Sequence, residues 1–124
     1  MEAQQQSIVK ADYKTGTYLG RIVETDGRRT LVEVLAVLRH PTQGDLHSSF
    51  DPDAPIFHER RASAYREKVW AMSHEVKPYA GEVPEYQASL AAAFAAEEER
   101  IDRMRRWAER CLTQLASLKS DYRL

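Results

Sequence analysis

Two histidines and an aspartate lie close together in a loop that directly follows the most apolar run of the chain. The run covers residues 31–38, and the loop 39–47 carries His40, Asp45 and His47. Loops held by a rigid scaffold carry function more often than the scaffold does. Because imidazole and carboxylate groups are the usual ligands of zinc and of hydrolytic metal ions, this loop is a candidate metal or catalytic site.

The ligand set of this candidate site is incomplete. His58 and Glu59 are of the right type, but neighbouring side chains on a strand point to opposite faces and would not bind one ion together. The chain also has no cysteine pair and no HExxH pattern. Asp45 is in addition a typical turn residue. We therefore predict no metal, no cofactor and no catalytic residue. An enzyme that uses a metal or small ligand at His40, Asp45, His47 and His58 remains the alternative.

A basic cluster further along the chain suggests a different use of the same region. Arg60, Arg61, Arg66 and Lys68 alternate with acidic residues, which is usually a solvated face of mixed charge. Arginine is also enriched at the energetic centres of protein interfaces, so the cluster could bind a protein partner together with the loop. The candidate partner-binding residues are His40, Gln43, Asp45, His47, His58, Arg60, Arg61 and Arg66.

Composition limits the class of protein. The 124 residues are 43% hydrophobic and 30% charged, which is typical of one globular domain. A net charge of −1 argues against a general nucleic-acid binder, which needs a basic surface. The single cysteine, Cys111, excludes an internal disulfide and fits a reducing compartment. No apolar run approaches the roughly 18 residues of a membrane span, and residues 1–6 lack the features of a signal peptide. We expect a cytoplasmic protein without membrane insertion.

The first half of the chain predicts β-structure. Residues 8–13, 17–25 and 30–38 are rich in β-branched and apolar side chains. Between the second and third of these strands, Asp26-Gly27 predicts a tight hairpin turn, because glycine adopts a positive φ without strain. The strand 30–38 is mostly apolar on both faces, so both faces need cover. We expect one face to line a small barrel and the rest of the chain to cover the other.

The middle of the chain is a long connection followed by weaker signals. Residues 40–55 contain three prolines, which exclude regular structure, and loops of this length are usually functional or disordered. The segment 56–69 has apolar spacings of both helix and strand, and we interpret it as a strand. Residues 76–79 predict a short edge strand, the position that Pro78 tolerates.

The last third predicts helix. No glycine or proline occurs from residue 85 to 122, and alanine is frequent. Glu97 interrupts the apolar pattern, so the segment is one long helix, a bent helix or a helical hairpin. Its stripe predicts either a coiled-coil seam that makes a dimer or, as we prefer, a helix lying on its own barrel. The stripe consists of Ile101, Met104, Ala108, Cys111, Leu115, Leu118 and Tyr122.

Several stretches together resemble the kinase-associated protein B family of Gram-positive bacteria, also named kinase-associated lipoprotein B. The likeness is dense from residue 8 to 86 and looser in the tail. It is carried by residues 8–20, 34–47, 57–62, 65–68 and 76–86. The resemblance implies a small barrel of the Src-homology-3 kind followed by helices. It also implies an accessory protein, without enzymatic activity, that lets a sporulation sensor histidine kinase feed its phosphorelay through protein–protein contact.

These observations predict one α+β folding unit. A small Src-homology-3-like barrel covers residues 1–84, and a helical segment, 85–124, packs on it. We expect a monomer or a helix-mediated dimer. The family name includes "lipoprotein", but the only cysteine is far from the start of the chain. We therefore expect no lipid anchor, and a cytoplasmic location peripheral to the membrane through the kinase partner.

Overall fold

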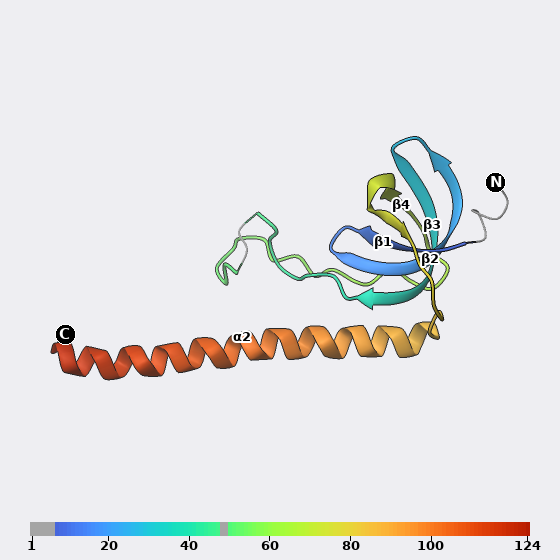
Figure 1. Ribbon diagram of the computed structural model, residues 1–124. Helices are drawn as coiled ribbons and strands as arrows, with labels where there is room; N and C mark the ends of the chain where they lie inside the picture. Colours follow the sequence, from blue (N-terminus) through green and yellow to red (C-terminus); the bar gives the residue numbers. More distant parts are fainter. Residues whose placement is uncertain (1–6, 48–49) are drawn as a thin grey trace. The chain divides into compact units, whose positions relative to one another are not determined.

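The computed structural model describes residues 7–47 and 50–124. In these residues a five-stranded antiparallel sheet, in the order β4-β3-β2-β1-β5, is followed by one long helix (Figure 1). The predicted α+β class and the C-terminal helix are confirmed. The elements are β1 (Ile8–Tyr13), β2 (Gly16–Asp26), β3 (Arg29–Arg39), β4 (Lys68–Met72), the short 3-10 helix η1 (Ser73–Glu75), β5 (Val76–Pro78) and α2 (Tyr86–Tyr122).

The hairpin between β2 and β3 follows the predicted turn. Asp26 pairs with Arg29, which leaves two residues in the turn. Gly27 has φ 57°, the left-handed conformation that glycine adopts most easily, and a Cβ added there would meet no atom within 4 Å. Backbone conformation and not space is therefore what requires glycine at this position.

Replacing Gly27 with valine is expected to lower the free energy of unfolding by about 1 kcal/mol or more, because a β-branched residue is strained at positive φ. Arg28→Val is the matched control: it places the same side chain on the other exposed turn residue, where we expect a change within about 0.5 kcal/mol. Urea unfolding of the three proteins measures the difference. Equal stability of Gly27→Val and the parent would contradict the strain at Gly27.

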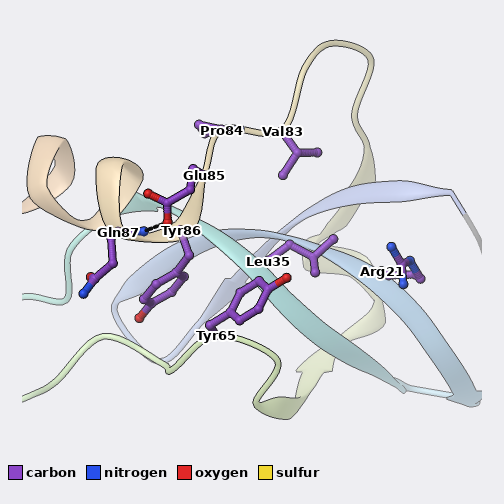
Figure 2. Close-up of a pocket in the computed structure, with 8 residues that line it drawn as sticks. All are labelled: Arg21, Leu35, Tyr65, Val83, Pro84, Glu85, Tyr86 and Gln87. Carbon is purple, nitrogen blue, oxygen red and sulfur yellow. Dashed lines mark hydrogen bonds between the residues drawn. The ribbon is translucent and has the colours of Figure 1, made fainter.

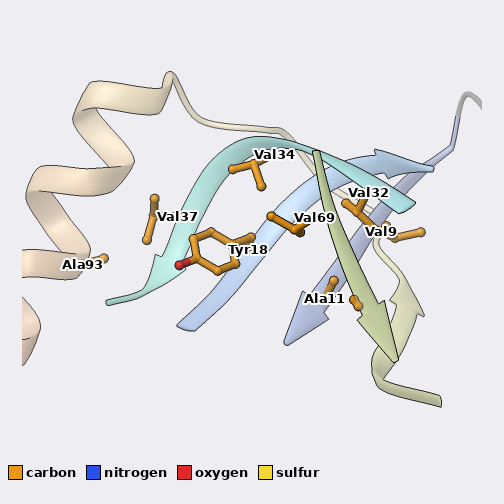
Figure 3. Packing of buried hydrophobic residues seen from close by; sticks show 9 residues of the cluster. Val9, Ala11, Tyr18, Val32, Val34, Val37, Val69 and Ala93 are labelled. Atoms are coloured by element: carbon orange, nitrogen blue, oxygen red, sulfur yellow. The ribbon is translucent and has the colours of Figure 1, made fainter. Parts of the chain in front are cut away.

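The core lies on β1, β2, β3 and β4, and Tyr18 of β2 is its largest side chain (Figure 3). β3 is buried on both faces, as expected from its sequence, because the neighbouring residues Ala36 and Val37, which point to opposite faces, are 0% and 2% exposed. The first turns of α2 supply part of the cover: Ala93 belongs to the core cluster, and Leu90 packs against it.

Ser89 fastens the start of α2 to β3 by a hydrogen bond. Its Oγ accepts from the backbone N–H of Val37 at 2.9 Å in a buried position, and it donates to the carbonyl oxygen of Tyr86 at 2.7 Å. The serine thus gives a β3 amide the partner that a neighbouring strand would otherwise provide.

Of the three forms left open for the tail, one long helix is the one that occurs, since α2 continues through Glu97, which makes a 2.7 Å ion pair with Arg100. A glutamate at position 97 interrupts the apolar stripe but not the helix, because glutamate and its neighbours have high helix propensity. By its contacts the chain divides after Phe94 into two units, 1–94 and 95–124. The second unit is helical to Tyr122. That barrel and tail fold as a single unit stays a prediction.

The prediction of a strand over residues 56–69 is wrong for most of its length. Only Lys68 and Val69 lie in β4, and residues 56–67 are irregular. Arg66 has φ 67°, which interrupts an extended chain. Just before β4, the backbone forms hydrogen bonds with β3. The N–H of Arg66 donates to the carbonyl of Val34 at 2.6 Å, and the N–H of Val34 donates to the carbonyl of Glu67 at 2.9 Å. The short edge strand around Pro78 is confirmed as β5.

Candidate functional site

Two chain segments leave the sheet and run beside each other (Figure 1). We call the described residues of this extension, 40–47 and 50–60, the arm. Its legs are joined by the Gln43 side chain, whose amide donates to the carbonyl of Arg60 at 2.8 Å and accepts from the N–H of Arg60 at 2.8 Å. Gly44 also donates to the carbonyl of His58 at 2.9 Å. The Gln43 side chain therefore joins the two legs by the pair of hydrogen bonds that a neighbouring strand would otherwise make with the backbone of Arg60.

Arg60 braces the arm from the other leg. Its guanidinium donates to the carbonyl oxygens of Thr42 at 2.9 Å and of Gly44 at 2.6 Å. Gly44 has φ 94°, and the ring of Phe57 would lie 3.0 Å from a Cβ at that position. Glycine is thus required here by both conformation and the neighbouring ring. The predicted residues Gln43 and Arg60 are brought together, and both stabilise the loop.

The histidines and the aspartate of the arm are placed separately. The His40 Nδ1 lies 3.0 Å from the carbonyl of Pro41, and its ring meets Phe94 edge-on with centroids 5.4 Å apart. Asp45 accepts from the backbone N–H of His47 at 2.9 Å, which is a turn-stabilising bond. Within the part of the chain that the structure describes, no group of three or more His, Cys, Asp or Glu side chains could hold a metal ion.

Arg66 and Arg61 differ in what they contact. The guanidinium of Arg66 lies 3.1 Å from Glu33, a buried carboxylate of β3 that also meets Arg21 at 3.7 Å. Arg61 is exposed, and among the described residues its side chain makes no ion pair or hydrogen bond. Arg61 is therefore available to a partner, whereas Arg66 is already paired with the buried carboxylate of Glu33. Sequence reasoning missed Glu33, although an acid inside an apolar strand is itself a signal of a paired charge.

Ser63 is a second group that the sequence did not reveal. Its N–H donates to the hydroxyl of Tyr18 at 3.0 Å, and its carbonyl accepts from the hydroxyl of Tyr86 at 2.7 Å. Burial raises the pKa of the Tyr86 hydroxyl, and the nearby Tyr18 and Glu67 raise it further. The hydroxyl therefore keeps its proton, and can donate, at more alkaline pH than an ordinary tyrosine.

A shallow groove of about 690 Å³ lies beside this contact, and none of the predicted site residues lines it (Figure 2). Its centre holds the rings of Tyr65 and Tyr86, with centroids 5.7 Å apart. Apolar side chains surround the rings, and charged or amide groups lie at the rim. The other lining residues are Arg21, Leu35, Val83, Pro84, Glu85 and Gln87.

No helix of the described residues has both the length and the apolar character needed to cross a membrane.

Comparison with known proteins gives one consistent result. The model of the family described as kinase-associated protein B matches residues 13–123. Kinase-associated lipoprotein B of Bacillus subtilis is 47% identical over 117 residues, which cover 94% of this chain and 91% of the relative. The crystal structure of kinase-associated protein B from Bacillus cereus matches with a TM-score of 0.66 and 36% identity, over 95% of each chain. The chain belongs to the kinase-associated protein B family.

Proposed function

We propose that this protein is a non-catalytic accessory protein that binds a sensor histidine kinase of the sporulation phosphorelay and promotes its activity by direct contact. The family and the names of its relatives support association with a kinase. No nucleic acid takes part. The B. subtilis relative is named a lipoprotein. For this chain we propose a cytoplasmic position, peripheral to the membrane through the kinase.

The fold that serves this role is, in our proposal, a small barrel of the Src-homology-3 kind. β4 leads through the short η1 directly into β5, and β5 pairs antiparallel with β1. The two edge strands are thus consecutive in the chain, and residues of β1 and β4 contact each other. Both features support a sheet curled towards closure.

The observation that carries the proposal is that the arm is braced and yet exposes large apolar side chains. Gln43 and Arg60 hold its legs together, while Phe57 is 63% exposed and Ile56 62% exposed. Neighbouring exposed apolar groups are typical of interaction surfaces. A braced surface also loses little entropy when it binds. The proposed contact residues are Leu46, His47, Ile56, Phe57, His58 and Arg61, and the bracing residues are His40, Gln43, Asp45 and Arg60. Arg66 lies outside the arm and pairs with Glu33 of β3.

The test is binding of the full chain to the purified cytoplasmic part of a sporulation sensor histidine kinase, together with that kinase's autophosphorylation rate. We expect Phe57→Ala to weaken binding by about tenfold or more, as loss of a central aromatic contact does, with the melting temperature unchanged. Gln43→Ala should weaken binding and also lower stability, because it releases both legs of the arm.

Tyr65→Ala is the matched control, since Tyr65 is an exposed aromatic residue in the groove and outside the arm. We expect it to bind the kinase like the parent. If Tyr65→Ala weakens binding and Phe57→Ala does not, the arm is not the contact surface. If the parent neither binds the kinase nor changes its autophosphorylation, the proposed function is wrong.

A further inference from the structure

The second unit is helical to Tyr122, and this part of α2 has an exposed apolar stripe. The stripe residues recur at alternating spacings of three and four, which is the a and d pattern of a coiled coil. Leu115 is 60% exposed and Tyr122 is 64% exposed. The stripe consists of Ile101, Met104, Ala108, Cys111, Leu115, Leu118 and Tyr122, with Ile101 at a and Met104 at d.

Most acidic side chains of this segment are already neutralised by arginines of the same helix. Asp102 accepts from Arg105 at 2.7 Å and from Arg106 at 2.9 Å, and Arg105 also reaches Glu109 at 2.8 Å. These pairs lower the pKa of Asp102 and lie away from the stripe or at its margin. They add modestly to the stability of the helix without deciding what covers the stripe.

Three charges beside the stripe have no such partner. Among the described residues, Glu98, Lys119 and Asp121 take part in no ion pair, whereas the neighbouring Glu97 and Glu99 both do. In the heptad that starts at Ile101, Glu98 and Lys119 occupy e positions and Asp121 a g position. These are the positions at which coiled coils select their partner and its direction.

An antiparallel second copy would pair these charges. If Ile101 packs beside Leu118 of the second copy, Met104 meets Leu115 and Ala108 meets Cys111. In that register the e positions place Glu98 beside Lys119 of the second copy. The g positions place Asp121 beside Arg100, which also pairs with Glu97 of its own helix. Each contact occurs twice because the pair has two-fold symmetry. Small residues then occupy the centre, where the two helices approach most closely.

A parallel pair fits these charges less well. Its g-to-e contacts would bring Arg100 beside Arg105 of the second copy, which places like charges together although each already has an acidic partner on its own helix. Glu98 would face Ala93, and Lys119 would face Gln114, so neither charge finds an opposite partner. Trp107 beside Leu112 is an apolar contact that the parallel pair gains, but it leaves all three unpaired charges without compensation.

We propose that residues 98–122 of α2 bind a second copy of this chain as an antiparallel helix pair. The inference rests on the tail alone and stands whether or not the kinase is the partner of the arm.

The first experiment measures the mass of the full chain by sedimentation over a concentration series. We expect a reversible dimer in the parent, and at least a hundredfold weaker association in Leu118→Asp, which introduces a charge into the apolar seam. Ser117→Asp adds the same charge one residue away from the stripe, and its dimer should persist. Circular dichroism is the control that checks whether both variants remain helical. A parent that stays monomeric throughout the series, or an equal loss in both variants, would overturn the proposal.

The second experiment tests direction by exchanging charges. Glu98→Lys and Lys119→Glu should each weaken the dimer by about tenfold, because each turns two attractions into two repulsions. The double variant restores both pairs with reversed sign and should recover the affinity of the parent. In a parallel dimer neither exchange creates or removes an ion pair. Single variants that bind like the parent, or a double variant weaker than either single one, would therefore exclude the antiparallel arrangement.

Discussion

A chain that ends at Pro84 is expected to lose cooperative unfolding, whereas a chain that ends at Arg100 is expected to keep it. The shorter fragment lacks Leu90 and Ala93, which pack against the core. Burial of one large apolar side chain contributes about 1.5–3 kcal/mol. Loss of Ser89 also leaves the buried N–H of Val37 without its partner, at a cost of about 1–3 kcal/mol. Small domains have only about 5–15 kcal/mol in total.

Thermal melts and size-exclusion chromatography of the two fragments measure this difference. The fragment 1–100 is the control, because it keeps every residue of α2 that packs on the core and removes most of the exposed stripe. We expect it to melt in one transition, and the fragment 1–84 to aggregate through the exposed face of β3. A soluble 1–84 fragment with a sharp melt would show that the sheet does not need the helix as cover.

Gly20→Ala is expected to destabilise the sheet strongly. A Cβ at this buried position of β2 would collide with Cγ1 of Val32 and would lie 2.5 Å from the carbonyl oxygen of Glu33. Both atoms belong to β3, and the oxygen is backbone that cannot rotate away. Overpacking of this kind costs about 1–3 kcal/mol, and we expect a value at the upper end because a backbone atom is involved.

Gly27→Ala provides the comparison for Gly20→Ala, because it adds the same methyl group where a Cβ meets nothing. Its cost should be only about 1 kcal/mol, from the positive φ. Denaturant unfolding of both variants separates collision from strain. If the two lose the same amount of stability, the close approach of β2 and β3 at Gly20 is not restrictive.

The features that the sequence predicted correctly depend on neighbouring residues. A turn needs only its own residues, as at Gly27, and the long helix follows from thirty-eight residues, 85–122, without glycine or proline. The burial of β3 on both faces could be predicted because the apolar residues themselves show it. In each case the energy that decides the structure acts within a few positions of the chain.

The irregular segment 56–67 could not be predicted in this way. Its backbone is satisfied by groups distant in sequence: Gln43 pairs with Arg60 across 17 positions, and the hydroxyl of Tyr18 meets Ser63 across 45. The same is true of the candidate site. The residue types that suggested a metal site or a docking loop were identified from the sequence. Which of them brace the arm and which stay exposed depends on the backbone carbonyls of the opposite leg that lie within reach of each side chain.

Two hydrogen bonds make the backbone of Ser63 the meeting point of three elements. Its N–H is tied to β2 through Tyr18, its carbonyl to the first turn of α2 through Tyr86, and the chain on its own N-terminal side leads back to the arm. A displacement of the chain at Ser63 would therefore stretch one or both of these bonds, so the position of the residues that lead into the arm is fixed by the strand and by the first turn of the helix together.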